Sequence, residues 1–446
     1  MSKVSKLIKD PELFMLDYVK KKAHILIEND ILGFGQQVYQ FEKNRQLKKD
    51  GSFYQKDLNK PKTYLIGFSP WKQFMMSAFP DREMIFIDKN ISAENFKKQW
   101  WFEILSSNDC NIMVWGFKVP KFILDFVGKH SIPLLYVEDG FIRSVELGAT
   151  KAPPFSLSVD SRTPYFNANV ASDLECLLST YSFDKEPDLL ERSHKFIQQL
   201  IATGISKYNQ SETVDIHSVY GEKTGKRVLV IGQVEDDASI AYGCNRKFTN
   251  NELVTIAYLE NPGAQIIYKP HPDVLHQKRP MLSNPKDVAH ICQVLDQDIP
   301  LAQSFETIDH VYTITSQAGF EALMRGIKVT TLGCPFYSGW GLTDDRQPNE
   351  RRTRKLTIEE LVAVVYFKYL KYFDPIYKKP LVAEEVVERL VQLKELKSKK
   401  DQLILTEKPV VLVKPKTYVF GLSPWKDLIK NLYTDREMIF LDKNIL

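Results

Sequence analysis

A segment of 31 residues occurs twice in this chain, and the spacing of its copies constrains the architecture more than any other feature. Residues 61–91 and residues 415–445 are identical at 19 of 31 positions. The period of 354 residues is long enough for two or more domains and far exceeds the unit of a solenoid. Because the second copy stops at residue 446, the sequence predicts one complete module (from residue 61) and the truncated start of a second (415–446).

The composition is that of a globular protein, with 43% apolar and 26% charged residues. A net charge of +4 over 446 residues does not indicate nucleic-acid binding. The five cysteines are scattered without a C-x-x-C pair, which favours reduced thiols and argues against a zinc site. The N-terminus lacks the apolar core of a signal peptide, and no apolar run approaches the roughly 20 residues that span a bilayer. We expect a cytoplasmic protein that is soluble or at most peripheral.

Residues 1–60 are polar and Lys-rich, with apolar positions at helical spacing. Two interpretations are open for this helical extension. It is either a solvated appendage or a weak anchor to an anionic membrane surface, because three consecutive lysines at 20–22 lie beside the apolar stripe.

Short apolar strands alternate with amphipathic helices in two blocks, at 61–215 and 226–356. Near-continuous apolar strands between helices predict parallel sheets covered on both faces. The expected fold class is therefore α/β, with two Rossmann-like doubly wound domains facing a cleft, which is a glycosyltransferase-B-like arrangement. The polar stretch 211–226 is interpreted as the interdomain linker, and 357–400 as C-terminal helices.

The first motif, VLVIGQVEDDASI, places Gln233, Glu235, Asp236 and Asp237 directly after a predicted strand. Ligands of doubly wound sheets bind beyond the carboxyl ends of the strands. A carboxylate there can act as a nucleophile or general base. The alternative is an acidic turn that caps the next segment.

The second motif, IIYKPHPDV, presents Lys269 and His271 after a strand. Each is followed by a proline, which stiffens the loop. An ammonium and an imidazole held side by side suit a phosphate group. A histidine that merely packs at the strand end is the alternative.

The third motif, TITSQAGFEALMRG, joins a strand to a helix through Ser316, Gln317 and Gly319. The free N–H groups at a helix N-terminus predict a phosphate or nucleotide site, and Glu321 could hydrogen-bond a ribose. Ordinary N-capping by Ser316 is the alternative.

The fourth motif, GCPFYSGWGLTDD, carries Tyr337 and Trp340 among glycines. It predicts a mobile aromatic loop that covers a sugar or base; a packed loop is the alternative.

The fifth motif, YVEDGFIRSVELGA, places Glu138 and Asp139 at a strand end near Arg143. Such a group could supply an acid or base facing the second domain, or form a structural ion pair.

Seven segments occur in the order EDGFIRSVELG, PPFSLSVDSR, ISKYN, GQVEDDASI, YKPHPDV, TSQAGFEAL and PFYSGWGLTDD. Over about residues 111–375 the chain resembles the KpsC-type, LipA-like capsule polysaccharide β-Kdo glycosyltransferases. The resemblance implies tandem modules, CMP-Kdo as donor, and a phosphatidylglycerol-type glycolipid as acceptor. It also implies capsule biosynthesis and export proteins as partners, at the inner face of the inner membrane. Another nucleotide-sugar transferase and a non-catalytic assembly module are the alternatives. The GQVEDDASI sequence is closer to that of the second module of this family, which leaves open which β-Kdo linkage is made.

When the family's motif residues are matched to positions of this sequence, the resemblance implies that Asp237 is the nucleophile of a retaining double displacement. Lys269 and His271 would bind the donor phosphate, and Glu138 or Asp139 would be the acid/base. The remaining predicted site residues are donor-binding Gln233, Ser316, Gln317, Gly319 and Glu321, and bordering Arg143, Lys207, Asn209, Tyr337 and Trp340. No D-x-D-type metal site is visible, so no metal cofactor is expected.

Overall fold

The computed structural model describes residues 60–107, 109–146, 151–209, 214–275, 279, 281–406, 416–420 and 437–441. The expectations for residues 1–59 lie outside the described residues. The chain forms two compact units, 1–394 and 395–446. In the described part of the chain no helix is long and apolar enough to cross a membrane.

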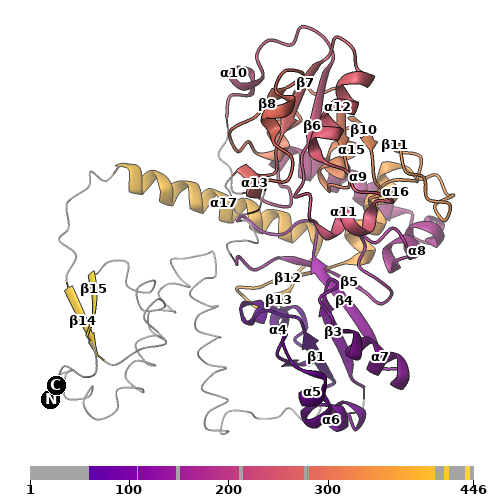
Figure 1. Ribbon diagram of the computed structural model, residues 1–446, viewed down its shortest axis with the longest axis vertical. Helices are drawn as coiled ribbons and strands as arrows, with labels where there is room; N and C mark the ends of the chain where they lie inside the picture. Colours follow the sequence, from indigo (N-terminus) through magenta and orange to yellow (C-terminus); the bar gives the residue numbers. More distant parts are fainter. Residues whose placement is uncertain are drawn as a thin grey trace. The chain divides into compact units, whose positions relative to one another are not determined.

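The N-terminal sheet of the first unit has seven strands in the order β13-β12-β5-β4-β3-β1-β2 (Figure 1). The four strands that come first in the chain are parallel to one another, as expected. They are β1 (Lys62–Ile66), β2 (Glu83–Phe86), β3 (Asn111–Trp115) and β4 (Leu134–Asp139). The other three add an antiparallel edge: β5 (Ser156–Asp160), β12 (Leu370–Asp374) and β13 (Lys379–Pro380). Its helices are η1 (Pro70–Phe74), α4 (Met75–Ala78), α5 (Ala93–Gln99), α6 (Trp101–Leu105) and α7 (Lys121–His130).

The C-terminal sheet has six parallel strands in the order β11-β10-β9-β6-β7-β8. They are β6 (Arg227–Ile231), β7 (Gln265–Lys269), β8 (Gln293–Val294), β9 (His310–Thr313), β10 (Lys328–Thr331) and β11 (Asp344–Asp345). β6 is buried at all five positions, because helices cover both faces of the sheet. The connecting helices are α11 (Ala238–Gly243), α12 (Asn250–Glu260), α13 (Pro272–Leu275), η4 (Pro285–Val288), α14 (Leu301–Ser304) and α15 (Ala318–Met324). The two Rossmann-like sheets give this unit a glycosyltransferase-B fold.

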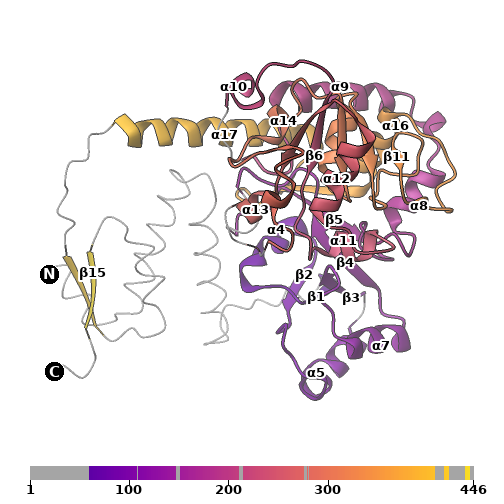
Figure 2. The same ribbon diagram turned by 45° about the horizontal axis from the view of Figure 1, so that its top comes forward.

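The chain first crosses from the N-terminal sheet to the C-terminal sheet between β5 and β6. Between β5 and β6 lie α8 (Asp173–Thr180), η3 (Phe183–Lys185), α9 (Asp188–Thr203) and α10 (Ile216–Tyr220). The apolar face of α9 belongs to the same buried cluster as residues of β6, and α8 and α9 lie beside the C-terminal sheet (Figures 1 and 2). Helix α9 therefore packs with the C-terminal sheet, although it lies within the block 61–215 that the sequence analysis assigns to the N-terminal domain.

The return crossing corrects the prediction of helices throughout 357–400. After α16 (Ile358–Val362) and a π-helical turn, η5 (Ala363–Tyr369), the chain forms β12 of the N-terminal sheet. β12 pairs Tyr372 with Ser156 and Leu370 with Ser158. Tertiary pairing of this aromatic-rich segment outweighs its local helical pattern. Helix α17 (Ala383–Thr406) follows, as predicted.

The second copy of the repeat contains a pair of strands. β14 (Lys416–Phe420) and β15 (Glu437–Leu441) are parallel, and Lys416 lies opposite Glu437 as Lys62 lies opposite Glu83. The two copies thus share one strand register, and the rest of the second copy lies outside the described residues.

Candidate active site

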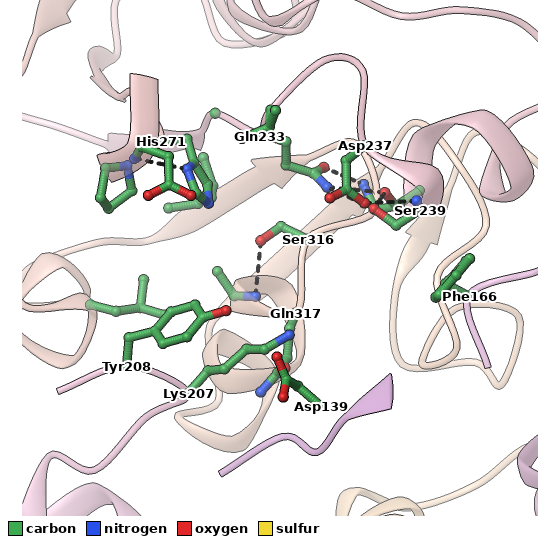
Figure 3. Close-up of a pocket in the computed structure, with 18 of the residues that line it drawn as sticks. Asp139, Phe166, Lys207, Tyr208, Gln233, Asp237, Ser239, His271, Ser316 and Gln317 are labelled. Carbon is green, nitrogen blue, oxygen red and sulfur yellow. Dashed lines mark hydrogen bonds between the residues drawn. The ribbon is translucent and has the colours of Figure 1, made fainter. Parts of the chain in front are cut away.

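A cavity of about 490 Å³ lies where the carboxyl ends of strands from both sheets meet. Its walls come from β4 and the loop after α9 on one side, and from the ends of β6, β7 and β9 on the other. Figure 3 shows Asp139, Lys207 and Tyr208 in the lower part of the view, near Gln317, and Gln233, Asp237 and His271 in the upper part. Open α/β sheets bind ligands at this edge, so we take this cavity as the candidate active site.

Asp139, the last residue of β4, is an ionised carboxylate with one unoccupied oxygen. Its Oδ2 lies 2.8 Å from Nε of Arg143, whose side chain is fully buried. Burial acts to raise the pKa of Asp139, but Arg143, Lys72 and Lys207 together hold that pKa below its ordinary value. The buried Oδ1 has no hydrogen-bond partner in the described residues. The predicted ion pair and the predicted cavity position therefore coexist.

The pKa of Glu138, the residue before Asp139 in β4, is shifted in the opposite direction. Burial raises the pKa of Glu138 to about 7, with Lys72 opposing that effect and Asp139 adding to it. Its carboxylate lies against Gly116, where any Cβ would clash with Oε1. Two adjacent carboxyl groups with pKa values pushed apart are typical of an acid/base and nucleophile pair.

The loop after α9 contributes Lys207, whose side chain is drawn beside Asp139 in Figure 3. Burial lowers the pKa of Lys207, but Tyr165, Tyr208 and Asp139 raise it by more, so the ammonium stays charged. Asn209 does not line the cavity. Its Nδ2 donates to Ser144 O at 3.0 Å and its Oδ1 accepts from Ser206 N at 2.9 Å, so it fixes the loop that carries Lys207.

Of the three carboxylates after β6, Asp237 alone lines the cavity. Asp237 caps α11, accepting from Ser239 N at 2.8 Å, and it is exposed. Glu235 accepts from Asn250 N at 2.6 Å, and Asp236 pairs with Arg279 at 2.6 Å. The capping interpretation and the cavity position both hold for Asp237.

Gln233 lines the cavity, but its amide joins two strand ends. Its Oε1 accepts from Thr315 N at 2.7 Å and its Nε2 donates to Thr315 Oγ1 at 3.1 Å. Its own backbone N–H donates to Asn250 Oδ1 at 2.9 Å. Gln233 therefore holds the ends of β6 and β9 at a fixed spacing.

Lys269 and His271 both line the cavity, as predicted from their position after β7. Lys269 Nζ donates to Ile299 O at 2.8 Å and lies 3.8 Å from Asp298 Oδ1. Burial lowers the pKa of Lys269 and also that of His271, although nearby carboxylates oppose both shifts. His271 Nδ1 accepts from Asp273 N at 3.1 Å, so the neutral ring carries its proton on Nε2.

The turn into α15 contributes Ser316, Gln317 and Glu321 to the cavity. Ser316 Oγ accepts from Ala318 N at 3.2 Å, as in an N-cap. Gln317 Nε2 donates to Phe141 O at 2.7 Å, whereas its buried Oε1 has no partner in the described residues. Burial raises the pKa of Glu321 to about 7, with Arg325 and Lys207 opposing.

Three predicted residues of this region lie outside the cavity wall. A side chain at Gly319 would clash with the Tyr337 hydroxyl, so this glycine permits packing. Tyr337 and Trp340 are fully buried. Tyr337 Oη donates to Ser316 O at 2.5 Å, and Trp340 Nε1 donates to Phe336 O at 2.9 Å. The prediction of a mobile aromatic cover is wrong for these two side chains, because they are part of the core.

Sequence reasoning missed several aromatic and basic residues of the wall. Trp115 ends β3, beside β4, and that strand-end position was the available signal. The other residues lie in loops, where no strand end marks them in the sequence as site residues. They are Lys118, Tyr165, Phe166, Tyr208 and Arg279.

The family described as capsule polysaccharide biosynthesis protein matches residues 111–373. Lipopolysaccharide-processing protein LpsZ of Rhizobium meliloti is 44% identical over 318 residues, which are 70% of each chain. Capsule polysaccharide modification protein LipA of Neisseria meningitidis serogroup B is 37% identical over 343 residues. That match covers 76% of this chain and 47% of LipA, so the chain spans about half the length of that relative.

Two solved structures of Thermosulfurimonas dismutans KpsC are similar to this chain. The beta Kdo 2,4 transferase is 30% identical with a TM-score of 0.62, and the match covers 73% of this chain and 97% of that chain. The beta Kdo 2,7 transferase is 30% identical with a TM-score of 0.57, covering 75% and 99%. The family match at 111–373 spans every residue that lines the cavity. This chain therefore belongs to the capsule polysaccharide biosynthesis protein family.

Proposed function

We propose that this protein is a retaining β-Kdo transferase. It moves Kdo from CMP-Kdo to the lipid-linked oligo-Kdo linker of capsular polysaccharide, in capsule biosynthesis and export. The observation that carries the proposal is one cavity that joins two partly buried carboxyl groups, whose pKa values are shifted in opposite directions, to the Lys269–His271 loop. The similarity to two KpsC transferases supports Kdo as the transferred sugar.

The wall at the C-terminal sheet suits the donor. CMP leaves as a phosphate anion, and His271 Nε2 can donate a hydrogen bond to it because Nδ1 is occupied by Asp273 N. The buried ammonium of Lys269 adds positive charge nearby. Preorganised donors of this kind stabilise the charge that develops in the transition state.

Retention requires two displacements at the anomeric carbon. A carboxylate attacks that carbon as the bond to CMP breaks, and an acceptor hydroxyl then displaces the carboxylate while a base takes its proton. Glu138 suits the base, because its pKa near 7 matches the pH of the cytoplasm.

Two residues compete for the role of nucleophile. Asp237 is the residue that the family resemblance implies, but one of its oxygens caps α11 and the side chain is exposed. Asp139 is held ionised by Arg143, and its Oδ1 has no hydrogen bond in the described residues. We favour Asp139, since Arg143 pairs with it and it lies next to Glu138 in the same wall.

The test is transfer from CMP-Kdo, generated in situ, to a synthetic lipid-like acceptor bearing one β-Kdo. A mass gain of one Kdo supports the proposal, and NMR of the product assigns its linkage. Asp125→Asn is a matched control, because Asp125 is an exposed partner of Lys121 away from the cavity. A folded protein that neither binds CMP nor transfers Kdo would favour the alternative of a non-catalytic assembly module.

A further inference from the structure

The turn after β3 presents an exposed lysine to the candidate active site. Trp115 and Lys118 both line the cavity, and Lys118 N donates to Trp115 O at 3.0 Å, which closes the turn. Trp115 is buried and packs edge-on against Phe68, with 5.5 Å between the ring centroids. Lys118, by contrast, is exposed. The turn thus holds one cationic side chain at the edge of the sheet where open α/β folds bind ligands.

Two glycines bring the backbone of this turn close to its neighbours. Gly67 and Gly116 have φ values of +80° and +51°. A Cβ at Gly67 would clash with Lys118 O, and a Cβ at Gly116 would clash with Glu138 Oε1. Glycine is therefore required at both positions by conformation and by space. The carboxyl group of Glu138 consequently lies against the same turn that carries Lys118.

The side chain of Phe117 anchors the turn to other parts of the cavity region. Its ring centroid lies 4.2 Å from that of Tyr242 in α11 and 5.8 Å from that of Phe166 in the loop after β5. Phe166 itself lines the cavity and is labelled in Figure 3. Since Trp115 and Phe117 are both packed against other rings, the turn is fixed by its aromatic residues and Lys118 is left for a ligand.

The basic residues of the cavity wall differ in their partners. Lys269 lies 3.8 Å from Asp298 Oδ1, and Arg279 pairs with Asp236 at 2.6 Å. In the described part of the chain no carboxylate lies within ion-pair distance of the Lys118 ammonium. An ammonium without a carboxylate partner, in the wall of a cavity, is suited to an anionic group of a ligand.

We propose that Lys118 determines specificity for an acidic acceptor, because its ammonium binds the carboxylate of the acceptor's terminal sugar. This inference rests on the proposed function, in which Glu138 takes the proton of the acceptor hydroxyl and the acceptor therefore lies beside this turn. Kdo is a sugar acid and is ionised at neutral pH. The carboxylates of the cavity would repel it, so an acidic acceptor needs a cation at this position. Lys207, also in the wall, lies beside Asp139 in Figure 3 and belongs to a different loop.

The first experiment compares two acceptors, an alkyl glycoside of one β-Kdo and the same glycoside with its carboxylate converted to a carboxamide. We expect the parental KM to be about tenfold lower for the acid, as for one charge-assisted hydrogen bond. Lys118→Met should remove this preference by raising KM for the acid alone, whereas Lys118→Arg should keep it. Lys121→Met is the matched control, because Lys121 is exposed and pairs with Asp125 outside the cavity. An unchanged preference in Lys118→Met would overturn the proposal.

The second experiment does not require transfer. Dissociation constants of both glycosides, measured by calorimetry in the presence of CMP, should show the same preference of about tenfold in the parental protein and none in Lys118→Met. Neither glycoside contains a phosphate, so a lipid phosphate cannot produce this result. A dependence on Lys118 that is seen only with a phosphate-bearing acceptor would overturn the proposal, as would equal or absent binding of the two glycosides by the parental protein. The expected binding without transfer would refute only the proposed function, and transfer without the preference would refute only the role of Lys118.

Discussion

The two walls of the cavity hold their polar groups in different ways. On the N-terminal side, charged side chains control one another: Arg143 fixes Asp139, and Lys207 stays charged among tyrosines and carboxylates. On the C-terminal side, the polar groups bond mainly to the main chain, as Lys269 does to Ile299 O and Asp237 to Ser239 N. The polar groups of the first wall are therefore held mainly by charge, whereas those of the second are held mainly by main-chain hydrogen bonds.

The sharpest test of this difference is the exchange of each aspartate for asparagine. If the N-terminal wall carries the nucleophile, Asp139→Asn should reduce single-turnover transfer by about 10⁴-fold or more, comparable to loss of a nucleophile. Asp237→Asn keeps a capping oxygen for Ser239 N and should cost much less. Rapid-quench assays with Asp125→Asn alongside would measure both. The reverse ranking would return the nucleophile to Asp237 and to the opposite wall.

On the binding wall, His271→Ala should weaken transition-state stabilisation by about 2–4 kcal/mol, because one preorganised donor to the phosphate is lost. This corresponds to a fall in kcat/KM of about 30- to 1,000-fold. The control is His217→Ala, since His217 is exposed and away from the cavity. Transfer at the parental rate by a folded His271→Ala protein would refute the role of this residue.

A smaller effect is expected from Glu321, a buried carboxyl group of α15 that lines the cavity. Its folded pKa of about 7 lies above the ordinary value, so its contribution to folding is present below about pH 4.5 and is lost as the pH rises through 7. Glu321→Gln lacks this loss. The free energy of unfolding of the variant minus that of the parental protein should therefore be about 1–3 kcal/mol larger at pH 8 than at pH 5. Urea unfolding at both pH values measures this, and a difference independent of pH would show that Glu321 is not protonated at neutral pH.

The smallest effect is predicted for metal removal. In the described residues no group of three or more His, Cys, Asp or Glu side chains is arranged to hold a metal ion. We expect donor charge to be stabilised by Lys269 and His271 instead, so that EDTA leaves the transfer rate unchanged. Strong inhibition by EDTA, reversed by added Mg²⁺, would contradict this division of roles.

The strand ends at this site could be predicted from the sequence, because an apolar run followed by polar residues marks the carboxyl end of a parallel strand. Glu138, Lys269 and Ser316 all follow such runs, and all three line the cavity. What local pattern does not encode is the partner of a side chain. The amide of Gln233 bonds Thr315, 82 positions away, and Tyr337 bonds Ser316 O. The position of β12 was missed for the same reason, since its partner β5 is remote in sequence.

The return of β12 to the N-terminal sheet also determines when that sheet can be completed during synthesis. β5 ends at Asp160 and β12 begins at Leu370, so the ribosome must add the whole C-terminal sheet before the edge of the first sheet can close. Domains generally fold as units as they emerge, from the N-terminus onwards. In this protein β5 therefore stays unpaired on one side until β12 has been synthesised. The N-terminal sheet is completed only after the strands of the C-terminal sheet have been made.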